Sequence, residues 1–145
     1  MRAIPESKHV RATDAKAQRT TYVFDAVSRL TRREYSDGTR VAFTYDNAGN
    51  RTKLQDSSGD RVTWTYDNTY QLTREQRSGT EAYDVTYTYD PVGNRSVKLE
   101  GGVRTTYSYD DANQLSYEYT PSARTTYTYS LVSQEQIDLH SSLLV

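Results

Sequence analysis

The chain has 145 residues, no cysteine, and a formal net charge of −1 from 18 basic and 19 acidic residues. The missing cysteines exclude disulfides and thiolate metal sites, and the balanced charge argues against nucleic-acid binding through phosphate neutralisation. No stretch is apolar enough to span a bilayer, so we expect no membrane insertion, and no signal peptide is visible at the N-terminus.

The apolar composition is unusual because aromatic residues take the place of aliphatic ones. Leu, Ile, Val and Phe together make only 24 residues, a level at which disorder is suspected. The chain also has 14 tyrosines and 20 threonines, and both residue types favour strands. Tyrosine buries its ring while its hydroxyl stays in water. We therefore expect an ordered β-protein with an aromatic core.

In chain order, the first predicted elements are an N-terminal extension, residues 1–7, and half a degenerate repeat between Val10 and Arg19. An aromatic–x–aromatic–Asp string then recurs at steps of 21, 21, 23, 20 and 20 residues. We expect residues 8–130 to form one array of about six repeats, with residues 131–145 as a divergent tail. The signature residues are Tyr22, Phe24, Asp25, Phe43, Tyr45, Asp46, Gly49, Asn50, Trp64, Tyr66, Asp67, Tyr87, Tyr89, Asp90, Gly93, Asn94, Tyr107, Tyr109, Asp110, Tyr127 and Tyr129.

Each repeat has the pattern of two strands. Apolar and polar residues alternate before most of the aromatic strings, as in Val41, Phe43 and Tyr45 against Arg40 and Thr44. This period of two predicts a strand with one buried face. We expect the aromatic set Tyr45, Trp64, Tyr66, Tyr87, Tyr89 and Tyr109 to be more buried than the polar set Thr44, Thr63, Thr65, Thr86, Thr88 and Ser108.

Two kinds of turn separate the strands. Gly38, Gly59 and Gly79 end short polar stretches, where we expect a positive φ, and Gly101–Gly102 is a hairpin dipeptide. The other turn follows each Asp, and its ending alternates between a Gly-Asn-Arg type and a Leu type, so neighbouring repeats need not be equivalent. The fold class is all-β: an antiparallel meander of tandem β-hairpins, with ten to twelve strands in a curved, twisted strip.

The pattern Tyr-x-Tyr-Asp-x-x-Gly-Asn-Arg, followed about ten residues later by Asp-Gly or Ser-Gly, resembles the YD repeats of the RHS family. That family includes bacterial Rhs polymorphic toxins, the C components of Tc insecticidal toxins, wall-associated proteins and teneurins. The resemblance implies hairpins in a long strip that spirals into a hollow shell around a toxin or other cargo. It also implies an extracellular or cell-surface location.

Three groups of residues have competing interpretations. The repeated Asp residues are expected to fix turns rather than to bind calcium, because the acidic spacing of a calcium loop is absent. The aromatic residues are expected to form cross-strand pairs rather than a sugar-stacking surface. The opposite face is expected to be solvated rather than anion-binding, and it includes Arg40, Arg61, Thr65, Thr88, Arg104 and Thr106.

We find no catalytic constellation, so we expect no enzyme activity, no cofactor and no metal. The predicted function is a structural segment of an RHS/YD-repeat shell that encloses or presents a toxin or other cargo. Its expected partners are the remainder of a larger RHS protein or its C-terminal cargo. One alternative is a cell-surface adhesion module that binds carbohydrate, and another is a truncated remnant of a larger RHS gene.

Overall fold

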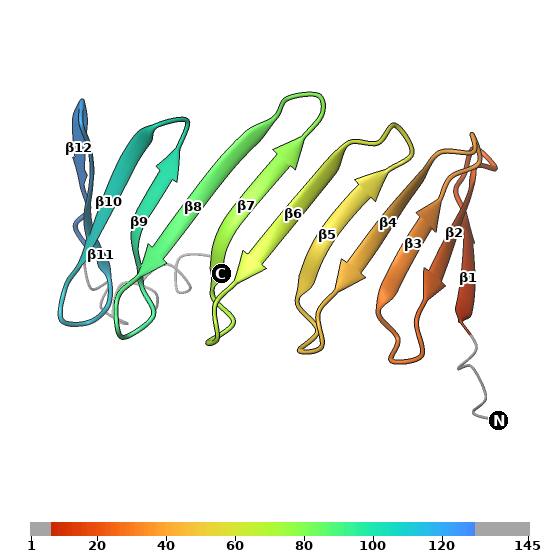
Figure 1. The fold of residues 1–145 in the computed structure, drawn as a ribbon, viewed down its shortest axis with the longest axis horizontal. Helices are drawn as coiled ribbons and strands as arrows, with labels where there is room; N and C mark the ends of the chain where they lie inside the picture. The colour runs from red at the N-terminus through yellow and green to blue at the C-terminus, as the bar shows by residue number, and fades with distance from the viewer. Residues whose placement is uncertain (1–6, 130–145) are drawn as a thin grey trace, which may run out of the picture.

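The structure is a computed structural model that describes residues 7–129. It consists of one twelve-stranded antiparallel sheet in which every strand pairs with its neighbours in sequence, from β1 to β12 (Figure 1). The predicted meander of tandem hairpins is therefore confirmed. The strands are β1 (Lys8–Thr13), β2 (Arg19–Phe24), β3 (Leu30–Glu34), β4 (Arg40–Tyr45), β5 (Arg51–Asp56), β6 (Arg61–Tyr66), β7 (Leu72–Ser78), β8 (Tyr83–Tyr89), β9 (Arg95–Glu100), β10 (Val103–Tyr109), β11 (Leu115–Thr120) and β12 (Ala123–Thr126).

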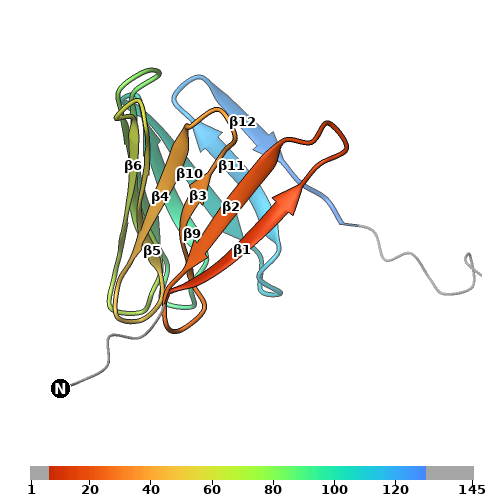
Figure 2. The ribbon, with the colours of Figure 1, turned by 90° about the vertical axis from the view of Figure 1, so that its right-hand side faces the viewer.

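The sheet is an open strip with a turn at each end of every strand. The turns that follow the aromatic–Asp strings all lie along one long edge, the lower edge in Figure 1, which we call the YD edge. The other turns lie along the opposite edge, which we call the distal edge. Figure 2 shows the strip bent, with the middle strands on one side and both ends turned toward the other.

The bend has a local cause at the YD edge. All five hairpins that turn there contain a register shift one residue before the turn, as between Val23 and Phe24 or between Thr65 and Tyr66. The pairs that turn at the distal edge keep a continuous register. A β-bulge bends its strand and increases the local twist. Five bulges at one edge therefore curve the strip cumulatively.

Strand register assigns each side chain to one of two faces. The tyrosine face carries the aromatic residues of the strings, for example Phe43 opposite Leu54 and Tyr87 opposite Lys98. The arginine face carries the residues between them, for example Arg61 opposite Gln55. Each face has neighbouring side chains but no second layer of protein over it among the described residues, because the sheet is a single layer.

The single layer limits burial, and here the expectation of an aromatic core is wrong. The buried hydrophobic residues of the described chain are two valines, Val23 at 7% exposure and Val85 at 4%. The six aromatic residues named above are half-buried. A planar ring on an uncovered sheet keeps one face in solvent, whereas the smaller valine is enclosed by its neighbours.

The predicted contrast between the two faces holds only in part. Thr44, Thr65 and Thr88 are exposed, as expected. Thr63, Thr86 and Ser108 are half-buried like the aromatic residues, because longer side chains flank them. Thr63, for instance, lies between Lys53 and Gln76 in adjacent strands.

Positive φ angles at the predicted glycines are confirmed. Gly38, Gly59 and Gly79 have φ of 85°, 98° and 98°, and Gly101 and Gly102 have 56° and 80°. Two consecutive positive φ values in a two-residue loop are typical of a type I′ turn, whose twist matches that of the two strands of a hairpin. Of the predicted segments, the tail 131–145 and nearly all of the extension 1–7 lie outside the described residues. No helix in the described chain is long and apolar enough to cross a membrane.

Candidate functional site: the aspartate turns of the YD edge

Every turn of the YD edge is built around its aspartate. The Asp backbone N–H donates to the carbonyl four residues later, and the N–H three residues later returns to the Asp carbonyl. The carboxylate accepts further backbone N–H groups: Asp67 accepts those of Thr69 at 2.8 Å and Gln71 at 2.9 Å. In a turn the backbone N–H groups have no partner in a neighbouring strand. An Asp side chain that accepts the N–H groups of the residues after it replaces those partners. The same turn forms at Asp25, Asp46, Asp67, Asp90 and Asp110.

Hydrogen bonding stabilises the ionised form of these carboxylates. The side-chain amide of Asn50 donates to Asp46 and lowers the pKa of that carboxyl group. At Asp90, desolvation pushes the pKa upward, but the backbone N–H and side-chain amide of Asn94 outweigh it, so the pKa is lowered. Donors to an ionised carboxylate act in this direction. The pKa is lowered at Asp25, Asp46, Asp67 and Asp90.

The fourth residue of each turn has a positive φ whatever its identity. Gly49 and Gly93 adopt it at 96° and 97°. Ser28, Tyr70 and Asn113 adopt it at 64°, 66° and 58°, although a side chain is strained there. The shared backbone thus determines the conformation of this position. Pro91 is the second residue of the turn at Asp90. This turn has the same bonds as the other four, since the Asp90 N–H donates to the Asn94 carbonyl and the Asp90 carbonyl accepts from the Gly93 N–H.

In five of the six strings the second aromatic residue is a tyrosine that fastens consecutive strands together, whereas Phe24 of the first string has no hydroxyl. The hydroxyl of Tyr66, at the end of β6, donates to the carbonyl of Arg51, the first residue of β5, at 2.9 Å. We call this bond the tyrosine clasp. It crosses the preceding hairpin and closes the open end of that strand pair. The clasps are Tyr45 to Leu30 (2.7 Å), Tyr66 to Arg51 (2.9 Å), Tyr89 to Leu72 (2.7 Å), Tyr109 to Arg95 (3.0 Å) and Tyr129 to Leu115 (3.0 Å).

A hydroxyl residue occupies each bulge. The residue left unpaired is Thr31, Thr52, Thr73, Ser96 or Ser116, always six residues after the Asp. The hydroxyls of Thr31, Thr73 and Ser116 donate to carbonyls two residues before the Asp, at 3.1, 3.0 and 2.9 Å. A bulge disrupts the ladder, and these hydroxyls replace part of the lost bonding.

The alternation of neighbouring repeats changes what covers the aromatic rings. Arg51 lies over Phe43 at 4.6 Å from the ring centroid, and Arg95 lies over Tyr107 at 4.6 Å and Tyr87 at 5.6 Å. These are cation–π contacts. The residue equivalent to each arginine in the other repeats is leucine, at Leu30, Leu72 and Leu115. Two repeats therefore form the full structural period.

The first aromatic residue of each string lies on the tyrosine face, away from the turns. Trp64 is opposite Glu75, whose carboxylate also accepts a hydrogen bond from the Tyr83 hydroxyl. That bond and burial raise the pKa of Tyr83 to about 12. The corresponding positions are Tyr22, Phe43, Trp64, Tyr87, Tyr107 and Tyr127.

Sequence reasoning identified the Asp and aromatic positions but missed the clasps, the bulge hydroxyls and the strained non-glycine residues. A Thr or Ser six residues after every Asp was visible in the sequence and was the available signal. Between residues 7 and 129, no group of three or more His, Cys, Asp or Glu residues lies close enough together to hold a metal ion.

Comparisons with known proteins agree with this geometry. Residues 24–61 match the family model described as RHS Repeat. No curated protein sequence matches the chain. Among solved structures, the fold is similar to a chain of the Photorhabdus luminescens Tc holotoxin pore with a mutated TccC3, with a TM-score of 0.64 and 22% identity over 75% of this chain and 6% of that chain.

A second similar structure is the crystal structure of TcdB2–TccC3–Cdc42, with a TM-score of 0.50 and 19% identity over 70% of this chain and 7% of that one. This chain thus spans only 6% and 7% of the chains that it matches. At such identity the likeness shows the fold alone. Residues 24–61 therefore match the RHS Repeat model, and the aspartate turns of the YD edge repeat one local geometry within that segment and beyond it.

Proposed function

We propose that the chain is a non-catalytic wall segment of an RHS/YD-repeat β-shell that encloses or presents a toxin or other cargo. Residues 8–130 are the wall, and residues 131–145 are a separate tail. The observation that carries this proposal is the cumulative curvature: five identical bulges and five tyrosine clasps lie along one edge of an open strip.

The open ends of the strip support the same proposal. β1 is exposed along its whole length, and β12 is exposed at all four residues. An unpaired strand offers N–H and C=O groups to a further strand. The sheet can therefore continue into more hairpins without a change in geometry, as a wall requires. The proposed partners are further RHS repeats and the enclosed cargo, and the proposed location is outside the cell.

The alternative of sugar stacking on tyrosine receives less support from the positions of the most exposed rings. Tyr70 lies in a turn of the YD edge at 64% exposure, and Tyr119 lies on the arginine face at 50%. Tyr129 lies beyond β12 at 56% exposure. A stacking platform needs adjacent rings on one surface, and these three lie in three places.

Cryo-electron microscopy of the protein expressed from its complete gene tests the proposal. We expect a hollow shell whose wall contains the strip, with the tyrosine clasps in register with the neighbouring hairpins. A protein that is a monodisperse 145-residue monomer, with a sharp cooperative thermal transition, would remove the shell proposal. Binding to a panel of neutral glycans distinguishes the adhesion alternative from the shell proposal, because only the adhesion alternative requires the strip to bind them.

A further inference from the structure

The arginine face concentrates positive charge that the net charge of the chain conceals. Strand register assigns nine cationic residues to it and two acidic ones, Glu34 and Asp84. The balancing acids, such as Asp56, Glu75 and Glu100, pair across the tyrosine face. The cationic residues are Arg11, Arg19, Arg32, Arg40, Lys53, Arg61, Arg74, Arg104 and Arg124.

Both acids of this face are already engaged. Glu34 lies 2.9 Å from the Arg32 guanidinium, and Asp84 pairs with Arg74. Arg32 and Arg74 are thus paired, and the other seven cations of the face have no ion-pair partner within residues 7–129. The face therefore carries a surplus of seven positive charges that the described part of the chain does not neutralise.

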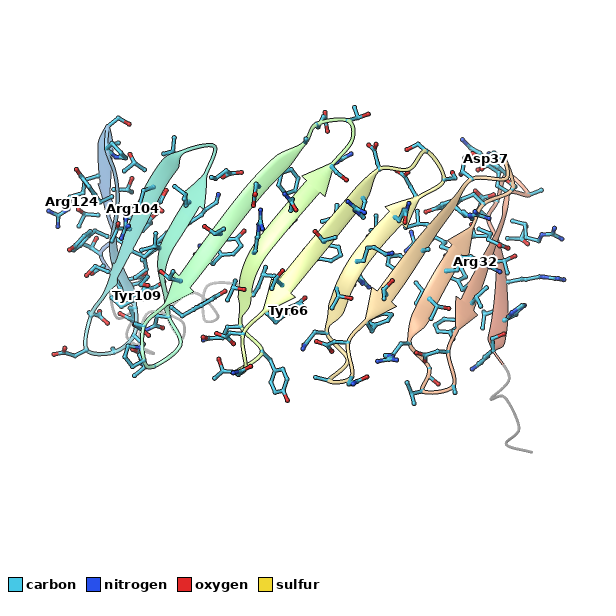
Figure 3. All side chains as sticks on the ribbon, in the orientation of Figure 1. Arg32, Asp37, Tyr66, Arg104, Tyr109 and Arg124 are labelled. Carbon is cyan, nitrogen blue, oxygen red and sulfur yellow. The ribbon has the colours of Figure 1, made fainter. Side chains whose placement is uncertain are left out.

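Five of these cations form a regular line, which we call the arginine row. Each lies five residues before the second aromatic residue of its string, at Arg19, Arg40, Arg61, Arg104 and Arg124. All five are exposed, and they lie on β2, β4, β6, β10 and β12. With strands 4.7–4.9 Å apart, members two strands apart are about 10 Å apart, and Arg61 and Arg104, which are four strands apart, are separated by about 20 Å. Figure 3 shows Arg104 and Arg124 in the distal half of the strip, away from Tyr66 and Tyr109 at the YD edge.

We propose that the arginine row binds an extended anionic polysaccharide that carries sulfate or carboxylate groups and lies across the strands. A guanidinium binds such groups through two parallel hydrogen bonds and is weakly hydrated. A linear polymer with an anion in every repeating unit meets a row of cations at a regular interval. Threonine hydroxyls such as Thr21 and Thr63 lie beside the row and supply further donors.

The composition of the arginine face favours a polysaccharide over the other polyanions. From β1 to β10 the face holds no Phe, Tyr or Trp, and its single imidazole, His9, does not form a run of rings on which successive unpaired bases could stack. The described residues form a curved sheet without a helix that could enter the major groove of duplex DNA. Leu99 is the one exposed large apolar residue of the face over these strands, whereas membrane-surface binding draws on several.

Binding of the full chain to heparin, used as the sulfated probe, tests this site. The double variant Arg40→Gln/Arg61→Gln should weaken binding about tenfold at low salt, since exposed ion pairs each contribute up to about 1 kcal/mol. The charge-matched control Lys8→Gln/Lys16→Gln removes two cations that lie off this face and should change binding less than about twofold. Circular dichroism checks that both variants keep their strands.

A gain of affinity provides the second arm of the test. Asp84 occupies the place in the row where the β8 repeat lacks an arginine, and it also neutralises Arg74. Asp84→Asn should therefore tighten heparin binding. Equal losses in the two double variants, no binding at low salt, or no gain from Asp84→Asn would overturn the site. Equal or tighter binding of single-stranded DNA or of phosphatidylserine vesicles would overturn the polysaccharide as its ligand.

Discussion

The two edges of the strip differ in how strictly one kind of turn is repeated. At the YD edge, each of the five turns uses the same five-residue loop, the same Asp bonds and a bulge at the same position. At the distal edge only the turns at Asp14 and Asp56 have these Asp bonds. No distal pair of the described sheet contains a bulge, and the loops range from five residues between Thr13 and Arg19 to the two residues Gly101–Gly102. Every change in repeat length therefore falls at the distal edge.

This difference shows which edge fixes the pairing register of the strands. A turn of the YD edge is bonded to the preceding strand through the tyrosine clasp, so a change there displaces two strands. Most distal turns are closed by bonds within themselves, as Asp37 is bonded to the N–H and hydroxyl of Thr39. The loop beyond Ser78 is an exception, because Asp60 from the neighbouring hairpin accepts the N–H of Thr80 at 3.2 Å.

Acid should act on both edges at once and is expected to have the largest effect. The pKa is lowered from 3.8 at four Asp residues of the YD edge, and also at Asp37 and Asp56 of the distal edge. A lowered folded-state pKa contributes stability that is complete above the unfolded value and is lost as pH falls through the folded value. The melting temperature should hold from pH 7 to about 5 and fall steeply below about 4.

Thermal melts by circular dichroism across this range measure the effect. Two double variants distinguish the contributions of the two edges to the pH dependence. Asp46→Ala/Asp67→Ala changes the YD edge, and Asp37→Ala/Asp56→Ala changes the distal edge. The first pair should remove more of the pH dependence than the second. Identical profiles for both pairs would show that the carboxylates of the two edges contribute equally.

Insertion of Gly-Ser between Asn47 and Ala48 should be the most damaging local change. It breaks the two backbone bonds of the turn at Asp46, at about 1 kcal/mol each, and it moves β5 away from the Tyr66 clasp. The same insertion between Glu81 and Ala82 lengthens a distal loop and should cost only about 0.5 kcal/mol. Urea unfolding of both variants compares them, and equal losses would refute the idea that register is held at the YD edge.

Gly79→Ala should destabilise the sheet by about 2 kcal/mol or more, because φ is 98° and the new Cβ would lie 1.9 Å from the Asp60 carboxylate. Gly59→Ala is the matched control. Its φ is also 98°, but nothing lies within 4 Å of the added Cβ, so it should lose only about 1 kcal/mol. A difference below the error of the chemical unfolding measurement would mean that the Asp60 contact does not form.

Removal of one clasp should have a smaller effect. Tyr66→Phe keeps the ring but leaves the Arg51 carbonyl without its donor, which should cost about 1 kcal/mol. Tyr70→Phe removes a hydroxyl from a ring that is 64% exposed, and it should be neutral. Hydrogen exchange at the β5–β6 pair should quicken in the first variant alone, and unchanged exchange would contradict a role for the clasp.

The smallest expected effect is a gain. Ser28 holds a φ of 64°, where glycine is unstrained. Ser28→Gly should stabilise the chain by about 0.5–1 kcal/mol, since relief of the strain exceeds the greater freedom of the unfolded glycine. Ser28→Ala keeps the strain and should bring no gain. Differential scanning calorimetry measures both variants, and a lower melting temperature for Ser28→Gly would show that this turn is not strained.

Sequence periodicity by itself determined the strands, the turns and the two faces. Aromatic and polar residues alternate along β4, β6 and β8, and the Asp and Gly positions mark where each strand must reverse. These are local properties, because a strand's period and a turn's φ are fixed by adjacent residues. For this reason the antiparallel meander and the positive φ at Gly38, Gly59 and Gly79 could be predicted.

Only the tertiary structure decided the long-range features. The tyrosine clasps join residues 14 to 17 positions apart, and the surplus charge arises only when alternate residues of different strands gather on one face. The extent of burial also came from the structure, since periodicity shows which face is apolar but not how far neighbouring side chains cover each ring. In a single curved layer, register brings distant residues together, and the absence of a second layer among residues 7–129 leaves the aromatic rings half-buried.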